Sequence, residues 1–103
     1  KVSVCTGAVL LGVAGFLTGK VATTHPMAFE RLSKFCKRVS EERIVDEGDV
    51  ITARGVTSSI DLGLYLVGKV AGSEVRDKIR KQMDYYPALD LLSRPAETRL
   101  DIE

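Results

Sequence analysis

Tryptophan is absent from the 103-residue sequence, and histidine, cysteine and proline are scarce, with one, two and three copies. Two cysteines, Cys5 and Cys36, are too few for a disulfide framework. Their spacing leaves a single bridge open, but free thiols in a reducing cytoplasm are the expected state. His25 is the only histidine, and no clustered His, Cys, Asp and Glu set exists, so we expect no metal site. No Walker or dinucleotide-binding glycine motif is present, and we expect no cofactor.

An excess of either charge is also lacking, since 15 lysines and arginines face 14 aspartates and glutamates. These charges are interspersed, whereas a nucleic-acid-binding domain usually carries a strongly basic face. The long charge-free stretch, Val2 to Leu17, is interrupted by glycines and too short for a bilayer. We therefore expect neither a nucleic-acid nor a membrane partner, and we interpret this stretch as buried structure.

The length suits one small domain, and β-prone runs alternate with helical patterns along it. Lys1–Val4 is the first β-prone run. Val9–Ala14 is apolar on all sides, which predicts a helix buried between layers and ended by Gly15. A second β-prone run, Val21–Thr24, follows, and then Pro26 suits the first turn of a helix.

The remaining pattern adds a hairpin and two helices. Arg43–Asp46 and Val50–Ala53 flank a glycine-containing turn, as in a β-hairpin. Ser58–Asp61 fits a capping box, and the helix after it is expected to end at Gly72. Ser73 is expected to cap a last helix. The helix that starts at Pro26 is expected to bury Ala28, Leu32 and Phe35. The helix after the capping box is expected to bury Ile60, Leu64, Val67 and Ala71. The last helix is expected to bury Val75, Ile79 and Met83.

Strands that alternate with helices predict an α/β layered fold with a largely parallel sheet, to which the hairpin adds an antiparallel element. After Tyr86 the periodicity fades, so we expect a tail over residues 87–103.

Cys5 stands where the first strand meets the first helix, which is the geometry of a nucleophile elbow with cysteine in place of serine. Gly7 and Ala8 are small enough for a tight turn. The helix N-terminus would stabilise a thiolate, and the N–H of Thr6 can donate to a developing negative charge. A small hydrophobe in a buried strand has the same local pattern, so the residues alone leave both interpretations open.

Other polar residues have similar alternatives. His25 can orient or protonate a group near Cys5, or it can make one structural hydrogen bond at a helix start. Ser58 and Asp61 favour helix capping over catalysis. Cys36 follows an apolar helix face and is interpreted as structural.

Several segments, taken in order, resemble consecutive blocks of the DJ/ThiJ/PfpI superfamily and nearly cover residues 2–84. They are Val4–Ala8, Ala14–Leu17, Gly19–Pro26, Arg43–Val45 with Gly48, Thr52–Gly55 and Ser58–Leu66. The resemblance implies a flavodoxin-like three-layer sandwich, related to class I glutamine amidotransferases. Residues 1–86 would be its C-terminal half. The family's cysteine matching Cys5 is reactive and oxidisable.

Within that family, Cys5–Gly7, Gly55–Thr57 and Gln82–Tyr85 resemble the isonitrile hydratase branch. Thr6 replaces the histidine of the peptidase-like branch, which argues against a protease. The resemblance implies an enzyme in which the Cys5 thiolate attacks an isonitrile and a thioimidate is hydrolysed to an N-substituted formamide. Cys5, Thr6 and His25 would be its catalytic residues.

Two alternatives stay open. Thr24–Pro26 and Thr52–Gly55 look closer to the glyoxalase and deglycase branch, which acts on small α-oxoaldehydes. Other branches of the superfamily use this fold as a non-enzymatic redox- or ligand-sensing domain, sometimes joined to a DNA-binding domain.

The resemblance also implies partners. The family's domain begins before its cysteine, and those first strands carry the carboxylate that faces the thiol and half of the oxyanion hole. We therefore expect a complementary N-terminal segment or chain, a small-molecule substrate, and a homodimer or larger assembly.

Overall fold

The computed structural model describes residues 1–86, which form a first compact unit, Lys1–Gly63, and part of a second that begins at Leu64. The predicted tail, 87–103, lies outside the described residues. No helix in the described part of the chain is both long and apolar enough to cross a membrane.

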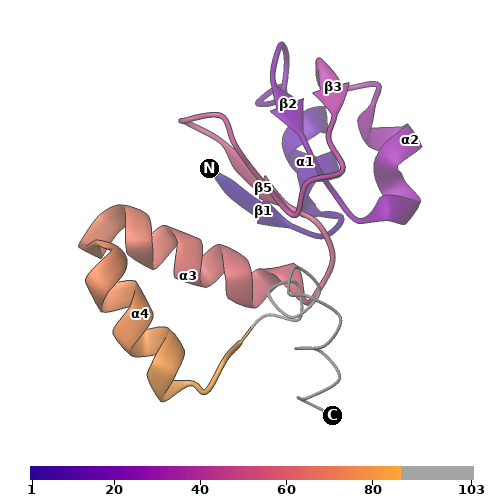
Figure 1. The fold of residues 1–103 in the computed structure, drawn as a ribbon. Coiled ribbons are helices and arrows are strands. Elements are labelled where there is room, and N and C mark those ends of the chain that lie inside the picture. Colours follow the sequence, from indigo (N-terminus) through magenta and orange to yellow (C-terminus); the bar gives the residue numbers. More distant parts are fainter. Residues whose placement is uncertain (87–103) are drawn as a thin grey trace. The chain divides into compact units, whose positions relative to one another are not determined.

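The first unit contains a three-stranded sheet of β1 (Val2–Val4), β5 (Ile51–Ala53) and β4 (Ile44–Asp46), in the order β1-β5-β4 (Figure 1). β1 runs parallel to β5, with Ser3 opposite Thr52, and β4 runs antiparallel to β5. The mixed α/β fold is therefore confirmed. Within residues 1–86, β1 lies at an edge of this sheet.

The predicted hairpin is confirmed, and its turn has a local cause. Gly48 has a φ of +91°, a conformation that glycine adopts without strain. The Asp46 carboxylate accepts a hydrogen bond from the Gly48 N–H at 2.8 Å, and the Glu47 N–H donates to the Val50 carbonyl at 2.9 Å. The turn therefore fixes the register of β4 against β5.

A second, two-stranded sheet pairs β2 (Val21–Ala22) in parallel with β3 (Arg38–Val39). β2 is shorter than the predicted run, because Thr23 and Thr24 leave the ladder. The sequence pattern did not predict β3.

Helix α1 (Gly7–Val13) ends as predicted, because Gly15 has a φ of +90°. The expectation that this helix is buried all round is wrong for the described residues. Ala8 and Gly12 are buried, whereas Leu10 is 74% exposed and Val13 is 66% exposed. α1 thus has an apolar outer face without a partner in residues 1–86.

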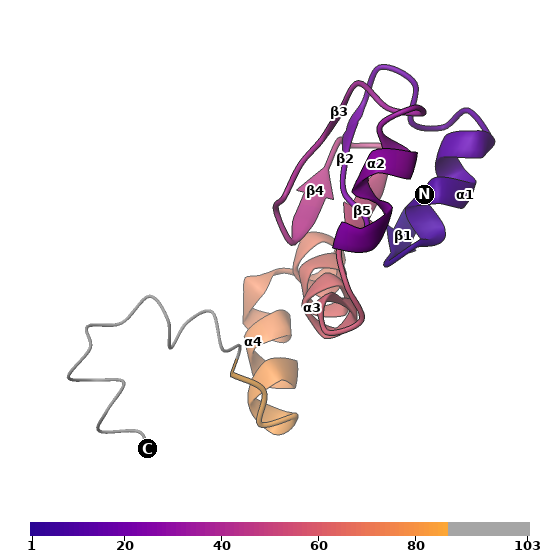
Figure 2. The ribbon, with the colours of Figure 1, turned by 90° about the vertical axis from the view of Figure 1, so that its right-hand side faces the viewer.

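The segment after β2 forms a short 3₁₀ helix, η1 (Pro26–Ala28), and then α2 (Phe29–Leu32), which contacts α1 (Figure 2). Proline begins the helical stretch as predicted, but Phe35 lies in the turn beyond its end. The core of this unit lies between these helices and the strands. It consists of Ala8, Leu17, Ala22, Leu32 and Val50.

Helix α3 (Ser58–Ala71) begins in the first unit, and α4 (Ser73–Gln82) belongs to the second. Gly72, at a φ of +96°, separates them as predicted. Two expectations are wrong here. Ser73 is the first residue of α4 and makes no cap. Of the predicted inner positions, Leu64 is buried as expected, whereas Ile60 is 42% and Met83 50% exposed.

Candidate active site

Cys5 occupies the junction between β1 and α1 with a φ of +58°. This left-handed conformation costs a non-glycine residue about 1–2 kcal/mol, so it persists only where the surroundings impose it. Strained strand-to-helix turns of this kind carry the nucleophile in elbow motifs. The side chain of Cys5 is half-buried, and the thiol is free.

The backbone of Cys5 is held on both sides. Its N–H donates to the carbonyls at the end of β5, at 3.1 Å to Ala53 and 2.6 Å to Arg54. Its carbonyl accepts a hydrogen bond from the Thr24 hydroxyl at 2.7 Å. Three separate segments therefore meet at this residue. The sequence pattern showed Thr24 only as part of a motif and gave no signal for this contact.

Thr6 is the N-cap residue of α1, but its side chain makes no capping hydrogen bond. Its carbonyl accepts from the Val9 N–H at 3.0 Å, which starts the helix. The Thr6 N–H has no acceptor within residues 1–86. This backbone donor directly follows Cys5 and is free to bind a negatively charged atom.

His25 is the N-cap of η1, and its Nδ1 accepts a hydrogen bond from the Met27 N–H at 3.1 Å. A nitrogen that accepts carries no hydrogen, so the neutral ring holds its proton on Nε2. The imidazole also lies beside Gly55, because a β-carbon there would be 3.8 Å from Cδ2 of His25. Gly55 directly follows Arg54, which binds the Cys5 N–H. His25 and Cys5 thus flank the same short segment.

Asp61 has a structural partner. Its Oδ2 atom accepts from the Arg43 guanidinium through Nη2 and, at 3.0 Å, through Nε. The backbone of Arg43 is also held, since its carbonyl accepts a hydrogen bond from the Arg54 N–H at 3.0 Å. The pair joins the first turn of α3 to the residue that precedes β4, and it gives the carboxylate a structural partner. Sequence reasoning missed this pair.

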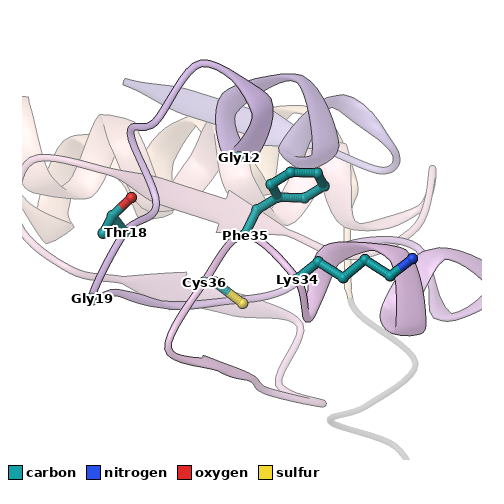
Figure 3. A pocket seen from close by; sticks show the side chains of 6 residues that line it. All are labelled: Gly12, Thr18, Gly19, Lys34, Phe35 and Cys36. Carbon is teal, nitrogen blue, oxygen red and sulfur yellow. The ribbon is translucent and has the colours of Figure 1, made fainter.

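Cys36 lies in a different environment from Cys5. Its thiol donates to the Leu32 carbonyl at 3.5 Å, and burial raises its pKa above the ordinary 9.0. It borders a hollow of about 220 Å³ that Gly12, Thr18, Gly19, Lys34 and Phe35 complete. Figure 3 shows the Phe35 ring directed toward the turn of α1 that carries Gly12. None of Cys5, Thr6 and His25 lines this hollow. The thiols of Cys5 and Cys36 are not bonded to each other.

Residues 1–86 contain no group of three or more His, Cys, Asp or Glu side chains that would hold a metal ion. The described residues offer a thiol with a free backbone N–H directly after it, and an imidazole beside Gly55.

Comparison with known proteins gives consistent matches. The model of the DJ-1/PfpI family matches residues 2–69. Isonitrile hydratase of Pseudomonas putida is 37% identical over 86 residues, which are 84% of this chain and 38% of that protein. The HTH-type transcriptional regulator CdhR of Pseudomonas aeruginosa is 34% identical over 79 residues, 75% of this chain and 24% of the regulator.

Among solved structures, a ThiJ/PfpI family protein from Pseudomonas syringae superposes with a TM-score of 0.79 at 31% identity. The match covers 98% of this chain and 44% of that protein. The chain therefore spans less than half the length of these relatives.

Proposed function

Because the chain belongs to the DJ-1/PfpI family, we propose that it supplies the nucleophilic half of an isonitrile hydratase-like enzyme, with Cys5 as the nucleophile. The observation that carries this proposal is the left-handed Cys5 at a strand–helix junction, held at both its N–H and its carbonyl. Such strain is typical of functional positions. The 37% identity to isonitrile hydratase supports isonitriles as the substrate class.

The reaction needs only the groups at this site and water. The sulfur of Cys5 bonds to the terminal carbon of the isonitrile, and that carbon takes up one proton, which gives a thioimidate. Water then adds to the same carbon, the C–S bond breaks, and the sulfur recovers its proton. The product is an N-substituted formamide, so the sum is isonitrile plus water. Covalent catalysis of this kind divides one difficult step into two easier ones.

His25 and Thr6 have separate roles in this proposal. Since Nδ1 of His25 accepts from the Met27 N–H, its Nε2–H donates a hydrogen bond to the reacting group, while the proton that the isonitrile carbon takes up comes from the Cys5 thiol. The free N–H of Thr6 stabilises the negative charge that develops when water adds to the thioimidate.

A complementary N-terminal segment or chain completes the domain in this proposal, with residues 1–86 as its C-terminal half. Relatives are more than twice as long as the matched region. β1 has a neighbour on one side only in the described part of the chain, and a parallel strand is normally paired on both sides and covered on both faces. The exposed Leu10 and Val13 of α1 supply an apolar surface for such cover. Homodimerisation of the completed domain, in a reducing compartment such as the cytoplasm, belongs to the same proposal.

The experiment that tests the function compares two substrates. The complete protein that contains this chain is assayed with n-butyl isonitrile, by the appearance of the formamide, and with methylglyoxal, by the appearance of lactate. Formamide formation supports the hydratase proposal. Turnover of methylglyoxal alone supports the glyoxalase activity of the branch that Thr24–Pro26 and Thr52–Gly55 resemble. Turnover of neither substrate counts against both enzymes.

The match to CdhR supports a second candidate, a ligand- or redox-sensing domain, because this regulator shares the matched region with the enzyme. A sensor would bind or react at Cys5 without turnover. Stoichiometric modification of Cys5 by peroxide or by an isonitrile, with no product release, would support the sensor.

A further inference from the structure

Thr24 and Thr23 are adjacent, and both side chains are completely buried. Their hydroxyls nevertheless differ. The Thr24 hydroxyl donates to the carbonyl of Cys5, 19 positions away in the sequence, at 2.7 Å. The Thr23 hydroxyl has no partner within residues 1–86, although the Thr23 N–H donates to the Thr52 hydroxyl at 2.9 Å. Of the two, Thr24 alone places its hydroxyl on the nucleophile's backbone.

The geometry of one peptide unit gives this contact a consequence. The carbonyl of Cys5 and the N–H of Thr6 belong to the same planar trans peptide, so they point in opposite directions. A donor that fixes the carbonyl therefore fixes the direction of the Thr6 N–H. The preceding peptide is fixed as well, because the Cys5 N–H is bound by Ala53 and Arg54. With both flanking peptides held, Cys5 stays in its left-handed conformation.

We propose that Thr24 is a positioning residue of this site. Its hydroxyl holds the Cys5–Thr6 peptide so that the thiol faces the reacting carbon and the Thr6 N–H faces the neighbouring atom on which negative charge develops. This inference rests on the proposed role of Cys5 as nucleophile, but it assigns a residue outside the set Cys5, Thr6 and His25. Thr24 acts through the backbone of Cys5 and does not touch the substrate.

The test uses variants that differ by one hydroxyl or one methyl group, made in the complete protein. Thr24→Val removes the hydroxyl and keeps the shape of the side chain, whereas Thr24→Ser keeps the hydroxyl. Thr23→Val is the matched control, since it removes an equally buried hydroxyl that has no partner in residues 1–86. Turnover of n-butyl isonitrile is measured as separate kcat and KM values, and the φ angle of Cys5 is read from crystals.

We expect Thr24→Val to lower kcat about 10- to 100-fold with little change in KM, because misaligned reacting groups slow the chemical step. Thr24→Ser and Thr23→Val are expected to stay close to the parent protein. An unchanged kcat in Thr24→Val, or equal losses in Thr24→Val and Thr23→Val, would overturn the proposal. If Thr24→Val does not fold, Thr24→Ala is compared with Thr24→Ser, because both lack the methyl group and only alanine lacks the hydroxyl.

Failure of the proposed function is separable from failure of this inference. If the parent protein hydrates no isonitrile, the proposed activity is wrong, and the φ angle still decides the role of Thr24. Departure of Cys5 from the left-handed region in Thr24→Val, but not in Thr24→Ser, supports positioning. Retention of the left-handed angle in both variants overturns it.

Discussion

A β-carbon placed on Gly12 would lie 2.6 Å from the β-carbon of Phe35, closer than packed side-chain carbons come. This contact joins α1 to the turn after α2 and explains why a glycine occupies the middle of a short helix. Any larger residue must push the two segments apart.

Gly12→Ala is therefore expected to lower the free energy of unfolding by about 1–2 kcal/mol, since overpacking outweighs the better helix propensity of alanine. Gly63→Ala is the control, because a β-carbon at this helical glycine would meet no atom within 4 Å. That control is expected to gain up to about 1 kcal/mol. Urea unfolding of both variants measures the difference, and a neutral or stabilising Gly12→Ala would contradict the contact.

The Arg43–Asp61 pair predicts a second stability difference. Asp61→Asn is expected to cost roughly 1–2 kcal/mol, because it weakens charge-assisted hydrogen bonds to a carboxylate that is only 16% exposed. Asp77→Asn breaks a pair whose carboxylate is 52% exposed, and we expect a change below about 0.5 kcal/mol. Equal losses of stability for the two variants in thermal unfolding would show that the Arg43–Asp61 pair stabilises the fold no more than the exposed pair does.

Burial of Cys36 predicts a pH dependence of its alkylation. Its pKa lies above 9.0 in the folded protein, so less thiolate is present at any given pH than in the unfolded chain. In a Cys5→Ser background, the iodoacetamide rate at Cys36 should rise with pH and reach its midpoint above pH 9.0. In urea, the midpoint should move down toward the ordinary value. A folded-state midpoint at or below that value would contradict the burial effect.

The elbow and the hairpin were predictable because their signals are local. Cys5 follows a β-prone run and is followed within three positions by the small residues Gly7 and Ala8. Gly48 marks the turn of the hairpin. β3 was not predictable, because Arg38 and Val39 form a two-residue strand that pairs with distant β2. The bond from Thr24 to Cys5 also joins positions far apart in the sequence.

Burial was predicted least well, for a physical reason. An apolar pattern shows that a side chain such as Leu10 favours burial, but it does not show which part of a protein provides the cover. In residues 1–86 nothing covers Leu10, which is 74% exposed.

The exposed face of α1 gives a prediction about the complementary segment. Residues 1–103 produced alone are expected to self-associate or precipitate, and co-expression with the segment should give a soluble complex. Leu10→Lys should weaken that complex, because it places a charge in the apolar contact. Glu30→Lys puts the same side chain on an exposed position of α2 and should leave the complex intact. Sedimentation velocity separates the outcomes, and a stable, cooperatively unfolding monomer of residues 1–103 alone would refute the need for the segment.

The most direct measurement compares Cys5→Ser with Cys36→Ser in the complete protein, using n-butyl isonitrile turnover. Both variants replace one free thiol by a hydroxyl, so only the position differs. Cys5→Ser should lose activity by about a thousandfold or more, because the nucleophile itself is gone, while Cys36→Ser keeps the parent rate. In the parent protein, mass spectrometry during turnover should find the mass of one added isonitrile on the peptide that carries Cys5. Turnover that survives in Cys5→Ser, or equal losses in the two variants, would contradict the assignment of Cys5 as the nucleophile.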